Sequence, residues 1–173
     1  MKLLVIVDYQ IDFVDGNLGF PKAQKLEEKI MKKVASYQER HDDIIFTLDT
    51  HQGDYLSTLE GQHLPIIHAL SKTKGHELYG KLQNVLGRRI EKDTFGSLEL
   101  VHHVQTHIYD SIELVGLVTN ICVIANAILM KTACPNTPIV VDAACTASFD
   151  DDLHEKALDV MTGLQIEIRN RGN

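Results

Sequence analysis

Residues 113–127 have the sequence ELVGLVTNICVIANA, in which a short apolar segment is followed by a turn and then by Cys122. The apolar segment is typical of a buried strand, and Cys122 falls in the predicted first turn of the next helix. Unpaired N–H groups and the positive end of a helix dipole favour a thiolate, and the same groups can hold an oxyanion beside the sulfur. The stretch therefore predicts a strand–turn–helix unit that carries a nucleophile. A buried cysteine that packs like a small apolar residue is the commoner alternative.

Strands and helices alternate on both sides of this unit. Apolar or β-type segments predict strands at residues 3–7, 43–48, 88–92, 108–115, 139–141 and 164–168. Apolar residues at helical spacing predict helices at 26–38, 98–105 and 153–162, beside the helix that begins near Cys122. Strands joined by crossover helices predict an α/β fold, a three-layer αβα sandwich with a mostly parallel, doubly wound sheet. The length of 173 residues predicts a single domain, 1–173.

Composition and charge exclude several classes of protein. The formal net charge of −7 disfavours a nucleic-acid partner. The apolar runs are far shorter than the roughly 18 residues of a membrane span, so we expect no membrane association. The start of the chain is too short and too soon acidic for a signal peptide, and three widely spaced cysteines fit a reducing compartment. We therefore expect a cytoplasmic protein, and further expect a homo-oligomer.

Chemically active side chains follow the predicted strands. Asp8 and Asp49 come directly after apolar strands, and Cys122 lies just past another. In parallel sheets ligands bind outside the carboxyl ends of the strands. The long connection from Thr50 to about Gly87 begins at the same edge, and loops of this length usually carry function.

Asp8 and Lys92 are candidate partners of the cysteine. The Asp8 carboxylate could take a proton from a nearby thiol and later return it to a leaving amine. Its alternative role is that of a helix cap or a loop charge. Lys92 ends a predicted strand, and beside Asp8 and Cys122 its charge would favour both anions. Otherwise it is a surface lysine.

A possible metal site follows the strand at 43–48. Asp49 and His51 are two residues apart, so in an extended chain they point the same way. Glu60 and His68 lie downstream in the long connection. Carboxylates with two imidazoles suit a divalent ion such as Zn²⁺, Mn²⁺ or Fe²⁺. The chain has nine histidines, so chance neighbours are the alternative.

Taken together, these segments resemble a known family. The residues that carry the resemblance are Asp8-Tyr9-Gln10-Ile11-Asp12-Phe13, Asp49-Thr50-His51, Glu60, Leu64-Pro65-Ile66-Ile67-His68, Gly75-His76-Glu77-Leu78, Lys92 with Phe95-Gly96-Ser97-Leu98, and Gly116-Leu117-Val118-Thr119-Asn120-Ile121-Cys122-Val123. The chain is similar to the isochorismatase-like cysteine hydrolases, and in particular to the nicotinamidases. The resemblance extends from Met1 to about Ser148.

The resemblance implies a role for each motif. Asp8, Lys92 and Cys122 correspond to a catalytic triad in which Cys122 attacks an amide carbonyl and forms a thioester. The backbone N–H groups of Val118 and Cys122 correspond to the oxyanion hole, with a cis peptide bond between Leu117 and Val118.

The resemblance also implies a metal and a substrate contact. One divalent metal would be bound by Asp49, His51, Glu60 and His68, and it would orient a substrate ring nitrogen. Zinc is the preferred metal, and manganese and iron are the alternatives. Phe13 would pack on the ring of a small-molecule amide.

The chain departs from the nicotinamidase pattern at two positions. Leu64 is the counterpart of an aromatic residue that stacks on the substrate ring in many members, and Tyr55 aligns near a further metal histidine of some members. A nicotinamidase-like amidase is therefore the preferred hypothesis. A metal-independent cysteine hydrolase of another small amide, ureido or N-carbamoyl compound is the second. A catalytically silent binding or scaffold domain is the third.

Overall fold

Six parallel strands form the centre of the molecule, which a computed structural model describes for residues 1–172. The strands are β1 (Leu3–Val7), β2 (Asp43–Asp49), β3 (Arg88–Lys92), β4 (Ile112–Leu117), β5 (Ile139–Ala147) and β6 (Glu167–Arg169). The α-helices are α1 (Ile11–Val14), α2 (Pro21–Gln24), α3 (Glu27–Glu39), α4 (Leu59–His63), α5 (Leu98–Thr106), α6 (Ile124–Ala133) and α7 (Asp151–Gly163). Short turns are η1 (Tyr55–Ser57), η2 (Lys74–His76), η3 (Gly80–Asn84) and the π-helical η4 (Thr119–Val123).

The strand order β3-β2-β1-β4-β5-β6 is that of a doubly wound sheet. β1 is central because its five residues are apolar and fully buried, as a strand covered on both faces requires. The chain winds outward from β1 to β3, returns to β4 beside β1, and then winds outward again to β6. The direction of winding therefore reverses between β1 and β4, which is where such sheets bind ligands.

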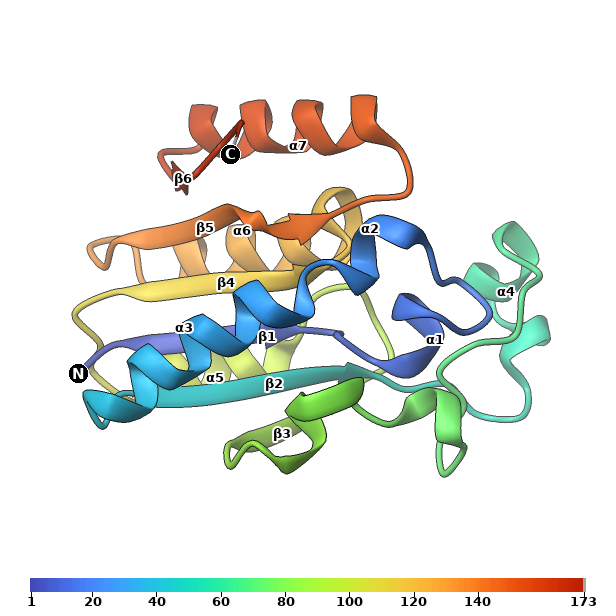
Figure 1. The fold of residues 1–173 in the computed structure, drawn as a ribbon. Helices are drawn as coiled ribbons and strands as arrows, with labels where there is room; N and C mark the ends of the chain where they lie inside the picture. Colours follow the sequence, from blue (N-terminus) through green and yellow to red (C-terminus); the bar gives the residue numbers. More distant parts are fainter. Residues whose placement is uncertain (173) are drawn as a thin grey trace.

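Helices cover both faces of the sheet (Figure 1). On one face α3 contributes Ile30, Val34 and Tyr37 to a core that includes Leu4 and Ile6 of β1. On the other face α5, α6 and α7 pack over Leu3, Val5 and Val7. Alternate residues of β1 thus belong to different cores, as the two-residue period of a strand demands. The predicted three-layer αβα class is confirmed.

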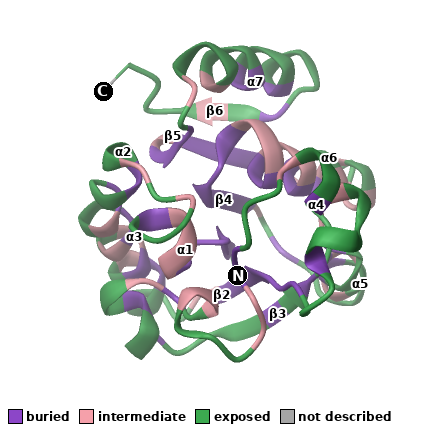
Figure 2. Ribbon diagram, turned by 90° about the vertical axis from the view of Figure 1, so that its right-hand side faces the viewer, coloured by how far each residue is buried: buried purple, intermediate pink, exposed green. Residues whose placement is uncertain are grey.

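The carboxyl ends of the strands carry the short elements. In Figure 1 this edge lies on the right, where α1 and α4 are placed; Figure 2 views the same edge and shows buried strands surrounded by helices with exposed outer surfaces. The predicted long connection contains the short turns η1, η2 and η3 and the five-residue helix α4. Within residues 1–172 no helix combines the length and apolar character needed to cross a membrane.

Four predicted strands have different bounds. β2 ends one residue later, at Asp49, and β6 spans Glu167–Arg169 rather than 164–168. β4 begins at Ile112 rather than Ile108, because Ile108 is 93% exposed and Asp110 instead binds the N-terminal amine. β5 continues to Ala147 rather than ending at Val141, because its register against β4 shifts through a bulge. The acidic Asp142 and the small residues after it resemble a strand end, although they form this bulge.

Candidate active site

The strands β3, β1 and β4, with β2 between the first two, deliver the candidate catalytic residues to one edge of the sheet. Asp8 follows β1, and Lys92 is the last residue of β3. Cys122 lies in η4, directly after β4. Lys92 pairs in register with Asp49 at the end of β2. The carboxyl ends of parallel strands meet at one edge, so residues far apart in the chain become neighbours.

Lys92 lies at the centre of the group. Its Nζ is 2.7 Å from Asp8 Oδ2 and 3.3 Å from Asp49 Oδ1, and it donates to Cys122 Sγ at 3.7 Å. All of these side chains are buried. The structure thus brings Asp8, Lys92 and Cys122 together, and it also links them to the first candidate metal ligand. The alternative hypothesis, in which Lys92 is a surface lysine, is wrong.

Burial controls the charge of the cysteine. It raises the pKa of the Cys122 thiol well above its ordinary value, Asp8 raises that pKa further, and Lys92 opposes both. The pKa of Lys92 is also raised, because attraction to Asp8, Cys122 and Asp49 outweighs the effect of burial. The helix-start position therefore does not by itself produce a thiolate. Burial favours the thiol form of Cys122, and a neighbouring base that takes its proton would generate the nucleophile.

The Asp8 carboxylate is oriented by two contacts, as a general base for Cys122 would need to be. Its Oδ1 accepts a hydrogen bond of 2.7 Å from Thr47 Oγ1, while Oδ2 faces Lys92. Burial raises the pKa of Asp8 and the Lys92 charge opposes that rise. Asp8 has a φ of +44°, a left-handed conformation that costs a non-glycine residue energy and persists where the surroundings enforce it.

The turn before Cys122 is as expected. The peptide bond between Leu117 and Val118 is cis, and the chain then enters the π-helical turn η4. Gly116 precedes it with a φ of +111°, and a Cβ there would lie 2.1 Å from the Val7 carbonyl oxygen. Only glycine fits that close approach of β4 to β1. Val118 and Cys122, the expected oxyanion-hole residues, lie at the first residue after β4 and in η4 respectively.

The four expected metal ligands also converge. Asp49, His51, Glu60 and His68 each offer a donor atom, and these atoms lie within 4.8 Å of one another. Nε2 of His51 is 2.9 Å from Asp49 Oδ2, and Nε2 of His68 is 3.6 Å from the same oxygen. Two carboxylates and two imidazoles around one point suit a divalent transition metal.

Three further observations fit a metal. His68 Nδ1 lies 2.7 Å from the carbonyl oxygen of Ile66, and a donor at Nδ1 leaves the Nε2 lone pair facing the other ligands. His51 Nε2 is buried and lacks an aligned hydrogen-bond partner among residues 1–172, although Asp49 is near. Burial raises the pKa of Asp49, but His51, His68 and Lys92 together lower it below its ordinary value. The charged carboxylate of Asp49 and the Nε2 atoms of His51 and His68 are ligand atoms that a divalent metal could bind.

Of the residues expected to contact the substrate, Phe13 packs against this group and Leu64 is linked to it through Tyr55. The Phe13 ring is 5.4 Å from the His68 ring in an edge arrangement. Tyr55 packs against both histidines, 4.5 Å from His51 and 5.0 Å from His68. Leu64 follows the end of α4, is half-buried, and accepts a hydrogen bond from Tyr55 Oη on its carbonyl oxygen. Tyr55 is thus a neighbour of the possible metal ligands rather than one of them.

Two supporting residues were not predicted from the sequence. Thr47 binds Asp8, and it is the polar residue inside the otherwise apolar strand β2. Gln10 is fully buried, and its side chain bonds the N–H and C=O of Asp49 and the carbonyl of His76. An amide residue three positions after β1, at the edge where the site forms, is the sequence signal that could have identified Gln10.

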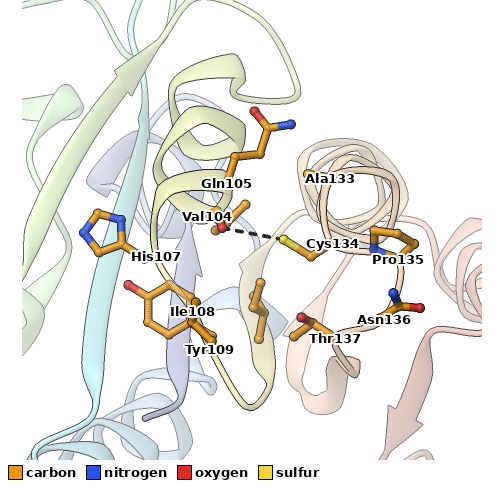
Figure 3. A pocket seen from close by; sticks show the side chains of 11 residues that line it. Val104, Gln105, His107, Ile108, Tyr109, Ala133, Cys134, Pro135, Asn136 and Thr137 are labelled. Carbon is orange, nitrogen blue, oxygen red and sulfur yellow. Dashed lines mark hydrogen bonds between the residues drawn. The ribbon is translucent and has the colours of Figure 1, made fainter.

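The surface depression in Figure 3 lies away from these residues. It has a volume of about 310 Å³ and is lined by the end of α5, the residues before β4 and the end of α6. This is the amino edge of the sheet. Cys134 lies in it and donates to the Val104 carbonyl at 3.7 Å. Burial alone raises the pKa of the Cys134 thiol.

Iodoacetamide with peptide mapping is expected to label Cys122 faster than Cys134 or Cys145. Cys122 has a base and a cation beside it, whereas burial raises the pKa of the Cys145 thiol to about 12. The variant Cys134→Ser serves as the control and should leave the rate of Cys122 labelling unchanged. Faster labelling of Cys134 or Cys145 contradicts the expectation.

The family model described as the isochorismatase domain matches residues 2–170. The chain belongs to the isochorismatase family. No curated protein sequence matches it. Among solved structures it is similar to the nicotinamidase/pyrazinamidase of Bacillus subtilis, with 26% identity, a TM-score of 0.87, and coverage of 98% of this chain and 99% of that one.

Two further structures define the range of this similarity. The pyrazinamidase/nicotinamidase of Streptococcus mutans is 27% identical, with a TM-score of 0.85 and coverage of 97% of this chain and 99% of that one. The N-carbamoylsarcosine amidase of Thermoplasma acidophilum is 19% identical, with a TM-score of 0.79 and coverage of 99% and 97%. The last comparison shows the fold alone. The isochorismatase fold therefore accompanies more than one amidase activity, and the substrate must be inferred from the site.

Proposed function

We propose that this isochorismatase-family hydrolase is a nicotinamidase-like amidase, which converts nicotinamide or a similar small amide into the acid and ammonia. The observation that carries the proposal is the position of Lys92 Nζ, which lies within 3.7 Å of both Asp8 and Cys122 and beside Asp49 of the metal-type cluster. A thiol, a carboxylate and a lysine in contact supply a nucleophile, a base and a charge that stabilises both.

The reaction follows from these contacts. Asp8 takes the proton of the Cys122 thiol, and the sulfur attacks the amide carbonyl carbon. The N–H groups of Val118 and Cys122 would bind the oxyanion that forms. Asp8 then gives its proton to the amide nitrogen, the C–N bond breaks, and ammonia leaves a thioester on Cys122. Water, deprotonated by Asp8, attacks the thioester, and the acid leaves as the thiol is restored.

Asp49, His51, Glu60 and His68 would hold a divalent metal. When bound, such an ion offers an open coordination position that can orient a ring nitrogen of the substrate. Phe13, packed edge-on against His68, would then contact one face of the ring. Zinc is the proposed metal, with manganese or iron as alternatives.

The second candidate function is metal-independent hydrolysis of another small amide, ureido or N-carbamoyl compound. Leu64 favours it, because an aliphatic side chain does not select for an aromatic ring. A silent binding or scaffold domain is disfavoured by the buried contacts of Lys92 with Asp8 and Cys122, since burying three such groups costs stability without a use. The cytoplasmic location and the homo-oligomeric state stay predictions.

The test is ammonia release from nicotinamide and from a panel of aliphatic amides and N-carbamoyl compounds. We expect nicotinamide to be hydrolysed to nicotinate. Hydrolysis of another panel member with nicotinamide untouched would transfer the assignment to the second candidate. No hydrolysis by a folded, metal-loaded protein would contradict both.

Metal content provides an independent prediction. Protein purified without chelator is expected to contain about one zinc, manganese or iron ion per chain, measured by elemental analysis. His51→Ala is expected to lose that ion, because it removes one of four converging ligands. His63, a histidine of α4 whose Nδ1 contacts the Leu59 carbonyl, offers the matched control His63→Ala, which should keep the metal. A metal-free protein with full nicotinamide turnover contradicts this prediction.

The residue at position 64 is expected to set the strength of ring binding. Leu64→Trp or Leu64→Phe should lower the KM for nicotinamide, by roughly tenfold if stacking returns about 1.4 kcal/mol. kcat should change little, because a stacked ring is bound alike in substrate and transition state. Steady-state kinetics measure both constants. An unchanged KM in both variants would show that side chain 64 does not contact the substrate.

A further inference from the structure

Asn126, in α6, is completely buried and makes hydrogen bonds with three backbone groups. Its Oδ1 accepts from the Ser97 N–H at 3.0 Å. Its Nδ2 donates to the carbonyl oxygens of Cys122 at 2.8 Å and Phe95 at 3.1 Å. A side chain of α6 therefore joins the nucleophile turn to the loop that directly follows Lys92.

These partners fix the orientation of the amide. A backbone N–H can only donate, so the atom that faces Ser97 must be the oxygen, and the amide nitrogen must face the two carbonyls. Ser97 is itself held, because its Oγ caps α5 by accepting from the Leu100 N–H at 3.1 Å. The amide of Asn126 is thus anchored on α5 and aimed at the carbonyl of Cys122.

The Cys122 carbonyl lies where such a contact has an effect. η4 is a π-helical turn and α6 begins just after it, so the backbone hydrogen-bond pattern changes beside Cys122. The Sγ atom must stay within reach of Lys92, to which it is linked at 3.7 Å. A donor on the Cys122 carbonyl fixes the backbone from which that sulfur projects.

We propose that Asn126 is a positioning residue of the active site, which holds Cys122 in register with Asp8 and Lys92 through the Cys122 carbonyl and the Phe95–Ser97 loop. The proposal rests on the proposed function in that it assigns Cys122 as the nucleophile. Nothing in the Asp8–Lys92–Cys122 contacts themselves requires a residue at position 126, so its role can be tested separately.

The experiment compares Asn126→Leu, Asn126→Thr and wild type, each loaded with metal. Asn126→Leu is nearly isosteric and removes all three hydrogen bonds. We expect its kcat to fall at least about tenfold, with KM within about twofold of wild type, because substrate binding is left intact. Asn126→Thr should recover part of the loss, because a threonine hydroxyl in this helix reaches the carbonyl four residues earlier, as Thr132 reaches Ile128 at 2.8 Å.

Thr132→Ala is the matched control, because it removes such a hydrogen bond from the same helix on an exposed face. It should leave kcat unchanged. If Asn126→Leu does not fold, Asn126→Ala is measured in its place with the same expectation. A kcat within twofold of wild type in the leucine or alanine variant overturns the proposal. So does an Asn126→Thr variant as slow as Asn126→Leu.

Alkylation separates this proposal from the assignment of substrate. The rate of Cys122 labelling by iodoacetamide needs no substrate, and it should fall at least about fivefold in Asn126→Leu, because a displaced sulfur loses Asp8 and Lys92. If wild type hydrolyses no amide while this rate falls, the proposed function fails and the role of Asn126 stands. An equal or faster labelling rate in Asn126→Leu overturns the role of Asn126 whatever the substrate.

Discussion

Cys122→Ala is expected to abolish amide hydrolysis, and Asp8→Asn is expected to reduce kcat by at least about 10⁴-fold. When residues act as one catalytic unit, removing any one of them removes most of the activity. In Cys122→Ala no atom remains to form the thioester. In Asp8→Asn no carboxylate beside the sulfur can take the thiol proton or return it to the leaving amine. Ammonia release under saturating substrate measures both effects.

Cys145→Ala is the matched control for this pair. Cys145 is also buried, but it lies in β5 within the core that α3 covers. The Cys145→Ala variant should keep full kcat, with a modest loss of stability. The double variant Cys122→Ala with Asp8→Asn should be no slower than Cys122→Ala alone. Appreciable turnover by a folded Cys122→Ala variant would place the nucleophile elsewhere.

Lys33→Met is expected to destabilise the protein by about 3–5 kcal/mol, the cost typical of removing one partner from a buried ion pair. Lys33 Nζ lies 2.6 Å from Glu113 Oε1 and 2.6 Å from Asp142 Oδ2, beneath α3. Both carboxylates are buried. Tyr37 Oη donates to the remaining oxygen of Glu113, Asn170 Nδ2 shares Asp142 Oδ2 with the lysine, and the Ala144 N–H donates to Asp142 Oδ1, but none of these donors carries a charge. Without the lysine, two buried anions face each other uncompensated.

Urea unfolding followed by circular dichroism measures this effect. Lys32→Met is the matched control, because Lys32 precedes Lys33 in α3 and is exposed. It should change the free energy of unfolding by less than about 0.5 kcal/mol. Equal stability of the two variants would mean that the Glu113–Asp142 pair does not depend on Lys33.

The regular part of the fold was predictable because buried parallel strands are continuous apolar runs. β1 and β3 have the predicted bounds, α3 begins and ends one residue later than predicted, and α5 ends one residue later. The errors lie where tertiary contacts override local pattern. Ile108 is apolar yet exposed, and β5 passes through a bulge that its sequence does not mark. The short helices α1 and α2 have too few residues for a periodicity to be visible.

The site divides in the same way. Asp8, Asp49 and Cys122 could be placed at one edge from the sequence, because each follows an apolar strand. Glu60 and His68 could be offered only as downstream candidates in the long connection, and the family resemblance was needed to assign them, since nothing local marks them. Thr47 and Asn126 could not be found, because each acts through contacts with residues distant in sequence or with backbone atoms. Lys33 appears to any sequence pattern as an ordinary helix-surface lysine.

The strand order has a consequence for synthesis of the protein. β1 is made first, yet one of its two neighbours is β4, so the strand ending at Val7 waits unpaired on one side until the strand beginning at Ile112 is made. During that interval an entirely apolar strand has a free edge, the feature that most readily joins chains together. The arrangement that places Asp8 beside Cys122 therefore leaves β1 open to association between chains until β4 is made, and rapid elongation would shorten that interval.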